Sequence, residues 1–108
     1  MLHKMKLQKD PFERMKNGSK TVEFRLYDEK RKKVKIGDEI EFSRLPDLTE
    51  KLMVKVEDLY IEKTFKDLFK KLYDNKKEVE EKTNRMYGYY TKEDESKYGV
   101  LGIKVKLL

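Results

Sequence analysis

The sequence feature that most constrains the fold is a long alternating stretch at residues 51–63. Val54 and Val56 alternate with charged residues, which predicts a β-strand with one buried face. Leu59 and Ile61 continue the alternation with the phase shifted by one residue. Such a shift predicts a bulge or bend within the strand. A long, bent strand is what a small closed or nearly closed β-barrel requires.

Four shorter alternating stretches predict the rest of the sheet. They are residues 1–7, 20–27, 39–42 and 101–107, and a short apolar segment at 34–38 ends in a Gly-Asp turn. Ile40 and Phe42 are expected to point into the core. His3 lies on the apolar face of the first stretch, where a packed histidine is favoured because no partner ligand or nucleophile is evident.

The expected helices have recognisable starts. Asp10 is expected to cap a short helix that has Pro11 at its first position. Thr64 is expected to cap an amphipathic helix, and Thr91 another short one. The polar residues 75–85 predict a weak helix or an ordered loop. The helix after Thr64 carries one apolar stripe at helical spacing, which is typical of core packing: Phe65, Leu68, Phe69, Leu72 and Tyr73.

These elements together predict an α+β fold. Strands joined by few residues are mostly antiparallel, and the last strand returns to the sheet after a long helical excursion. We therefore expect a small mixed, mostly antiparallel β-barrel of five to six strands with two to four short helices beside it. A chain of 108 residues is expected to form a single domain, residues 1–108.

Composition excludes several classes of function. The chain has no cysteine and one histidine, which rules out disulfides, thiolate metal sites and covalent cysteine catalysis. We expect no metal and no cofactor. No stretch approaches the ~18 apolar residues of a membrane span, and the N-terminus is too short and too charged for a signal peptide. A cytoplasmic protein that is a monomer is expected.

The net charge of +6 is concentrated in the N-terminal third. Residues 1–37 hold 12 Lys+Arg against 5 Asp+Glu, whereas residues 38–108 hold 15 against 16. A basic surface on an otherwise neutral body indicates a polyanionic partner, most simply nucleic acid. Richness in Lys and Glu also has a plainer explanation, because it is found on thermophilic surfaces.

The polar face of the strand at residues 20–27 is unusual. It carries Thr21, Glu23, Arg25 and Tyr27, so a carboxylate and a guanidinium stand two residues apart between a hydroxyl and a phenol. If this face meets water, it is an ordinary polar face, which strand alternation alone favours. If another part of the chain covers it, the same residues line a pocket.

Other candidate residues lie in three segments. The basic run that includes Lys32 and Lys33 is either a solvated loop or a phosphate-binding one. Arg44 follows the third strand. Tyr89 and Tyr90 belong to the run Met-Tyr-Gly-Tyr-Tyr, which is equally consistent with a surface for stacking on bases and with a hydrophobic plug under a loop.

One motif resembles a known family. Gly18, Lys20, Glu23 and Arg25 stand as G-x-K-x-x-E-x-R directly after the short helix. This resembles the ASCH domain, a branch of the PUA-like superfamily. The resemblance extends over nearly the whole chain and includes the segment Ile-Gly-Asp-Glu-Ile-Glu-Phe at 36–42, the tyrosine run and the Tyr-Gly-Val entry into the last strand.

The resemblance implies a barrel with helices flanking a cleft, and it implies binding of RNA or a nucleotide. Lys20 and Arg25 would bind phosphate or a base carbonyl. Glu23 would fix Arg25 or accept from a base edge, and Tyr89 or Tyr90 would stack on a base. The full set of expected nucleic-acid-binding residues is Lys20, Glu23, Arg25, Tyr27, Lys32, Lys33, Arg44, Tyr89 and Tyr90.

Two alternatives stay open. Some ASCH proteins are N4-acetylcytidine amidohydrolases with a Lys, Thr and Glu set, and another is described as a ribonuclease. For an enzyme of this kind the candidate catalytic residues are Lys20, Glu23 and Thr21, although Glu23 occupies the position of the threonine and Thr21 is displaced. The other alternative is a protein–protein adaptor, in which Glu23 and Arg25 form a structural ion pair and the tyrosines form an interface.

Overall fold

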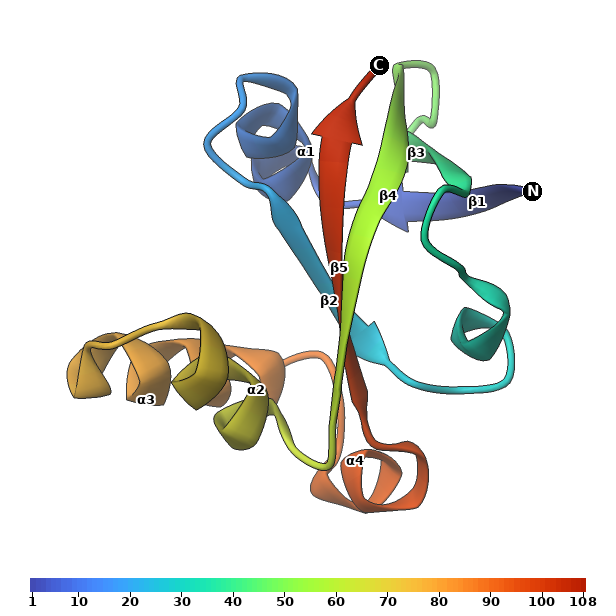
Figure 1. Cartoon of the computed structure of the whole chain (residues 1–108). Helices are drawn as coiled ribbons and strands as arrows, with labels where there is room; N and C mark the ends of the chain where they lie inside the picture. Colours follow the sequence, from blue (N-terminus) through green and yellow to red (C-terminus); the bar gives the residue numbers. More distant parts are fainter. The chain divides into compact units, whose positions relative to one another are not determined.

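The computed structural model describes all 108 residues and has an α+β architecture. Its elements in chain order (Figure 1) are β1 (Leu2–Leu7), α1 (Lys9–Lys16), β2 (Val22–Leu26), a 3-10 turn η1 (Arg31–Lys33), β3 (Glu39–Arg44), β4 (Lys51–Glu62), α2 (Phe65–Leu72), α3 (Lys76–Met86), α4 (Lys92–Tyr98) and β5 (Val100–Leu107). The five strands and four helices fall within the expected numbers. None of the helices combines the length and apolar character needed to cross a membrane.

The strands form one mixed, mostly antiparallel sheet in the order β1-β3-β4-β5-β2, a curled half-barrel. The pairing of β1 with β3 is parallel, with Leu2 opposite Glu39 and Leu7 opposite Arg44. The pairing of β3 with β4 is antiparallel. The first and third strands can be parallel because a long connection, which contains α1, β2 and η1, separates them along the chain. The predicted fold class is confirmed.

The chain forms two compact units. The first comprises Met1–Glu23, Val34–Leu59 and Ile103–Leu108, and the second comprises Phe24–Lys33 and Tyr60–Gly102. In the first unit, α1 packs against β3. Its buried side chains include Ile40 and Phe42, as expected from the alternation of β3. The largest other fully buried side chains of this unit are Phe12, Met15 and Ile103.

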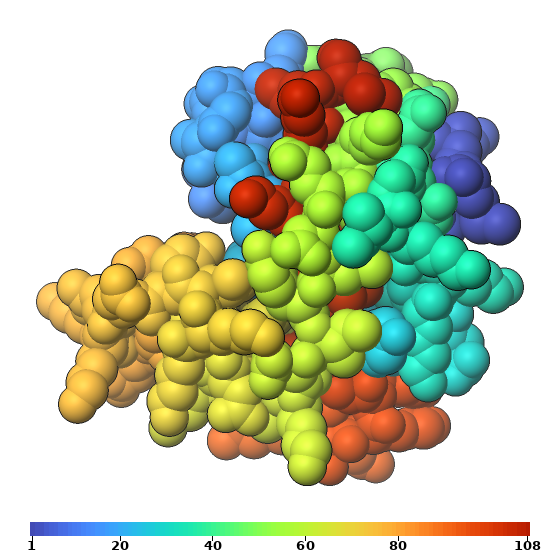
Figure 2. All heavy atoms as spheres, in the orientation of Figure 1, coloured from blue at the N-terminus to red at the C-terminus, as the bar shows by residue number.

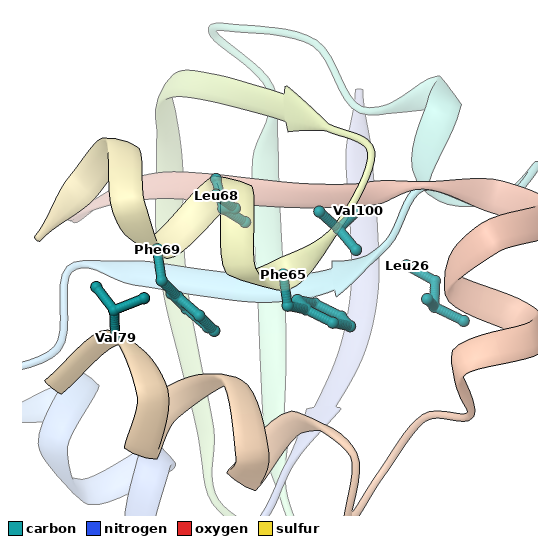
Figure 3. Packing of buried hydrophobic residues seen from close by; sticks show 6 residues of the cluster. All are labelled: Leu26, Phe65, Leu68, Phe69, Val79 and Val100. Atoms are coloured by element: carbon teal, nitrogen blue, oxygen red, sulfur yellow. The ribbon is translucent and has the colours of Figure 1, made fainter. Parts of the chain in front are cut away.

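The second unit has a core between helices α2 and α3, which lie side by side (Figures 1 and 2). Figure 3 shows Phe69 of α2 and Val79 of α3 pointing toward one another. Phe65 and Leu68 are fully buried in the same cluster, which Leu26 and Val100 complete. Burying each large apolar side chain contributes about 1.5–3 kcal/mol, so this stripe is a main source of stability for the unit.

The helix starts are predicted correctly for α2 and α4 but not for α1. Thr64 accepts a hydrogen bond from the Asp67 N–H at 3.1 Å, and Thr91 caps α4 in the same way. Helix α1 begins one residue before Asp10, and its N-cap is Gln8, whose side chain makes no capping bond. Pro11 therefore stands at the third helical position, where its missing N–H costs nothing because the first turn lacks partners anyway.

The predicted change of phase in β4 is wrong at Ile61. That side chain is 50% exposed. Tyr60 instead packs against the core cluster of the second unit, on the face that already carries Val54 and Val56. The sequence pattern misled because it followed Leu59 and Ile61 and left Tyr60 out, although a tyrosine ring buries like an apolar side chain while its hydroxyl stays near water.

Candidate nucleic-acid interface

The motif residues Lys20 and Glu23 form an ion pair that is largely withdrawn from water. The Lys20 Nζ lies 3.4 Å from Glu23 Oε1, and the two side chains are 11% and 8% exposed. The Lys20 ammonium also donates to the carbonyl oxygen of Val22 at 2.7 Å. A charged pair at this depth needs such additional partners, because burial removes the hydration of both ions.

Local structure explains how the pair is positioned. Gly18 follows α1 with φ of +88°, a conformation that favours glycine and ends the helix. The backbone N–H of Lys20 then donates to the Arg14 carbonyl at 3.0 Å. One residue later the Thr21 carbonyl accepts from the Val105 N–H at 2.8 Å, which fixes the entry into β2. The short helix therefore delivers Lys20 to the start of the strand.

The polar face of β2 is not uniformly solvated. Strand alternation alone favours a solvated face, and this is wrong for Glu23, which is buried. Thr21 is exposed and Arg25 is half-buried. Tyr27 is also half-buried, and its backbone N–H donates to the Gly99 carbonyl at 3.0 Å.

The basic run after β2 is partly neutralised by its own acidic residues. Asp28 accepts from the backbone N–H and the guanidinium of Arg31, at 3.0 and 3.1 Å. Lys32 lies 3.3 Å from a Glu29 oxygen, and its ammonium stands 5.7 Å from the centre of the Tyr27 ring. Lys33 is exposed. Asp28 therefore fixes the backbone of the turn through Arg31, and Lys32 and Lys33 remain exposed to water.

Arg44 is engaged elsewhere in the first unit. Its Nη1 lies 3.1 Å from Glu13 Oε1 and 3.7 Å from Glu50 Oε1. Glu50 also pairs with Lys16, and this contact lowers the pKa of Glu50 and raises that of Lys16. The guanidinium of Arg44 therefore ties α1 to the end of β3.

The tyrosine run separates into different roles. Tyr90 stacks on the buried Phe65, with ring centres 5.7 Å apart. Of the two interpretations of the tyrosine run, a stacking surface and a hydrophobic plug, Tyr90 fits the plug. Tyr89 is 64% exposed. Tyr87 donates its hydroxyl to Glu95 Oε1 at 2.8 Å. Desolvation and this hydrogen bond together raise the pKa of Tyr87 to about 12.

Sequence reasoning missed Glu95. It is 5% exposed, and its other oxygen accepts from the backbone N–H of Phe65 at 2.8 Å. Glu95 stands among other acidic residues in the first turn of α4, where a carboxylate is ordinary because it complements the helix dipole. No signal in the sequence distinguishes it from its solvated neighbours.

His3 and Asp38 form a second polar contact that sequence reasoning did not foresee. His3 Nε2 lies 2.8 Å from Asp38 Oδ2, and the N-terminal ammonium lies 3.3 Å from Asp38 Oδ1. The hydrogen bond with His3, followed by one from the Lys35 backbone N–H, lowers the pKa of Asp38 to about 2. This pair ties the start of β1 to the turn before β3.

Comparison with protein families decides the identity of the chain. A family model of the ASCH domain matches residues 5–108. The chain belongs to the ASCH family. ASCH domains have a PUA-like fold that is often linked to RNA binding. The match covers the whole motif from Gly18 to Arg25 and the contact between Tyr87 and Glu95.

Two solved structures are similar to this ASCH protein over its full length. The crystal structure of the hypothetical protein PH0355 is 34% identical, with a TM-score of 0.85 and both chains covered completely. The solution structure of protein PF0455 from Pyrococcus furiosus is also 34% identical, with a TM-score of 0.74 and coverage of 100% of this chain and 98% of that one. No curated protein matches the chain.

Proposed function

We propose that this ASCH domain binds RNA or a nucleotide through Lys20, Glu23 and Arg25. The basic N-terminal third would add affinity that does not depend on base sequence. Lys20 and Arg25 would contact phosphate or a base carbonyl, and Glu23 would orient these cations or accept a hydrogen bond from a base edge.

The observation that carries this proposal is the withdrawal of the Lys20–Glu23 pair from water. The idealised penalty for burying an ion is several kcal/mol, and an apolar pair of similar volume is often no less stable. The pair is therefore poorly explained as a source of stability. Held 3.4 Å apart, with Lys20 also bonded to Val22, it is suited to ligand recognition because its geometry is set before a ligand arrives.

Arg25 belongs to the proposal through its place on β2. It follows Glu23 by two residues on the same strand, and it is half-buried. Alternate residues of a strand point to the same face and stand about 7 Å apart. That separation suits two groups that contact adjacent parts of one nucleotide, and a guanidinium recognises phosphate or guanine edges with two parallel hydrogen bonds.

The test is fluorescence anisotropy of labelled single-stranded RNA, duplex RNA and DNA at two salt concentrations. Arg25→Gln is compared with Arg14→Gln, which removes the same charge from an exposed residue of α1 that pairs with Asp10. A charge-assisted contact contributes about 1.5–3 kcal/mol, so Arg25→Gln is expected to weaken binding roughly 10- to 150-fold. Arg14→Gln is expected to have a much smaller effect, which disappears at high salt.

Three results would reject the proposal or change it. No binding at low salt by the native protein would reject it. Equal effects of the two arginine variants would move the site away from β2 to the basic turn at Lys32 and Lys33. Shortened RNA, or loss of acetyl groups from N4-acetylcytidine, would show that the same residues support hydrolysis. Thermal unfolding of both variants checks that each remains folded.

A further inference from the structure

Tyr89 is the one exposed aromatic side chain of the protein. Its ring is 64% exposed, whereas the other tyrosines and all phenylalanines are half-buried or buried. An aromatic ring left on the surface forgoes the stabilising free energy that burial of its apolar area would contribute. The residues near Tyr89 in the chain, however, make contacts that fix the segment that carries this ring.

The residues on both sides of Tyr89 are anchored. Tyr90 stacks on Phe65, which is completely buried. Tyr87 is bound through its hydroxyl to Glu95, whose second oxygen holds the first N–H of α2. The segment is therefore joined to α2 and α4 within the second unit.

The backbone of the segment is also ordered. The N–H groups of residues 87–90 all donate to carbonyl oxygens at the end of α3, at 2.9 to 3.2 Å. Tyr89 and Tyr90 share the Met86 carbonyl in this series. The backbone that carries the ring is therefore already ordered before a ligand arrives, which lowers the cost of placing a ligand on this turn.

Cationic side chains accompany the turn. The ammonium of Lys92 lies 5.2 Å from the centre of the Tyr87 ring. Arg85 is exposed, and its carbonyl accepts the Gly88 N–H at 3.0 Å, so it opens the same turn. Single-stranded nucleic acids bind where an aromatic ring and cations are both available, since a base stacks on the ring while phosphates meet the cations. Arg85 and Lys92 lie four residues before and three residues after Tyr89 along the chain, so the same segment carries both kinds of group.

We propose that Tyr89 stacks on one unpaired base of single-stranded RNA, with Arg85 and Lys92 contacting the flanking phosphates. Tyr87, Tyr90 and Glu95 are positioning residues that hold the turn. The inference rests on the proposed function, and it assigns that function a single-stranded substrate. Bases within a duplex are already stacked on both faces, so only an unpaired base can lie against an external ring.

The protein contains no tryptophan, which allows a direct test. Tyr89→Trp introduces a single indole whose emission reports contact with a base. Single-stranded RNA is expected to quench this emission with the same midpoint as its anisotropy titration, and a duplex of the same sequence is expected to leave it unchanged. The control Tyr98→Trp places the indole at a half-buried tyrosine of α4 and is expected to show no quenching.

The RNA affinity of two further variants tests the stacking by Tyr89 independently. Stacking contributes about 1–3 kcal/mol per base, so Tyr89→Leu is expected to weaken binding of single-stranded RNA roughly 5- to 150-fold. Tyr89→Phe keeps the ring and is expected to bind as the native protein does. Because Tyr89 is exposed, neither change is expected to alter the unfolding temperature by more than roughly 2–4 °C, the range usual for surface substitutions.

The outcomes separate this inference from the function on which it rests. If the native protein binds RNA and Arg25→Gln weakens it, but Tyr89→Leu does not and the indole is not quenched, the inference is wrong and the proposed function stands. Equal quenching by duplex RNA would also overturn it. If the native protein binds no RNA, both fall. Quenching by single strands together with the loss in Tyr89→Leu and retention in Tyr89→Phe supports it.

Discussion

The substitution Tyr87→Phe tests the buried carboxylate of Glu95 with the smallest possible change. It removes one hydroxyl and leaves the ring in place. The lost hydrogen bond is 2.8 Å long, and its acceptor belongs to a residue that is 5% exposed. Hydrogen bonds to charged groups contribute about 1.5–3 kcal/mol. Because Tyr87 itself is half-buried and water can reach part of the site, we expect the low end, about 1.5 kcal/mol.

Urea unfolding at neutral pH measures this loss. With a slope of about 1–3 kcal/mol per molar urea, the midpoint of Tyr87→Phe is expected to fall by roughly 0.5–1.5 M. In the background of Glu95→Gln the acceptor is neutral, so the same change is expected to cost less, about 0.5 kcal/mol. The coupling between the two substitutions then isolates the charged hydrogen bond.

Alkaline pH supplies a second signature of the same contact. Burial and the Glu95 hydrogen bond raise the pKa of Tyr87 to about 12 from an ordinary value near 10. The stability linked to this raised pKa is therefore complete below pH ~10 and is lost as pH rises toward ~12. The difference in unfolding free energy between the native protein and Tyr87→Phe should be constant up to pH ~10 and shrink above it. The other tyrosines and the lysines titrate in both proteins, so their contributions to the unfolding free energy cancel in that difference.

The reasoning is refuted if the two proteins unfold at the same urea concentration at neutral pH. That result would mean that Glu95 exchanges the tyrosine hydroxyl for water without cost. A full loss of stability with no coupling to Glu95→Gln would equally contradict it, since the cost would then come from repacking of the ring.

Three other substitutions test local features of the fold. His3→Leu removes the largest cause of the lowered pKa of Asp38, a contribution present above pH ~4 and lost as pH falls toward ~2. Urea midpoints are therefore expected to fall less steeply between pH 5 and 2.5 in the variant, and parallel slopes would count against this. Thr64→Ala removes the cap of α2 and is expected to cost about 1 kcal/mol, or roughly 4–8 °C in unfolding temperature, whereas Thr64→Ser should be nearly neutral. Gly99→Ala forces φ of +74° on a side chain and brings its Cβ to 3.1 Å from a β4 carbonyl oxygen, so about 1–3 kcal/mol of stability is expected to be lost. Gly18→Ala has a similar φ but open space around it, and a loss there as large as at Gly99 would show that the close approach is unimportant.

Helix ends were predictable where the signal lies in adjacent residues. The hydroxyl of Thr64 reaches an N–H three residues along the chain, so residue identity and spacing suffice to foresee the cap. The start of α1 was misplaced because Asp10 and Pro11 are tolerated at more than one position of a first turn. Here Asp10 pairs with Arg14 instead of capping the helix.

The buried face of a strand was harder to predict than the strand itself. Alternation identifies which residues share a face, but it does not say how far that face extends or what covers it. Ile61 is exposed and Tyr60 is packed because the core cluster of the second unit lies on the side of Tyr60. The polar residue Glu23 is buried for the same kind of reason, and alternation alone assigned it to water.

The sequence by itself determined the five strands, the helices other than α3, the excess of positive charge, the absence of thiol chemistry and, through its motif, the ASCH family. These properties depend on composition and on residues within a few positions of one another. Only the tertiary structure decided which polar side chains leave water and which aromatic ring remains in it. Glu95 is bound by an N–H 30 residues away along the chain, and Tyr89 is exposed because Tyr87 and Tyr90 are both held by other elements. Local patterns predicted the burial of apolar side chains such as Phe42. They did not predict the burial of polar ones, because that depends on segments that meet only after folding.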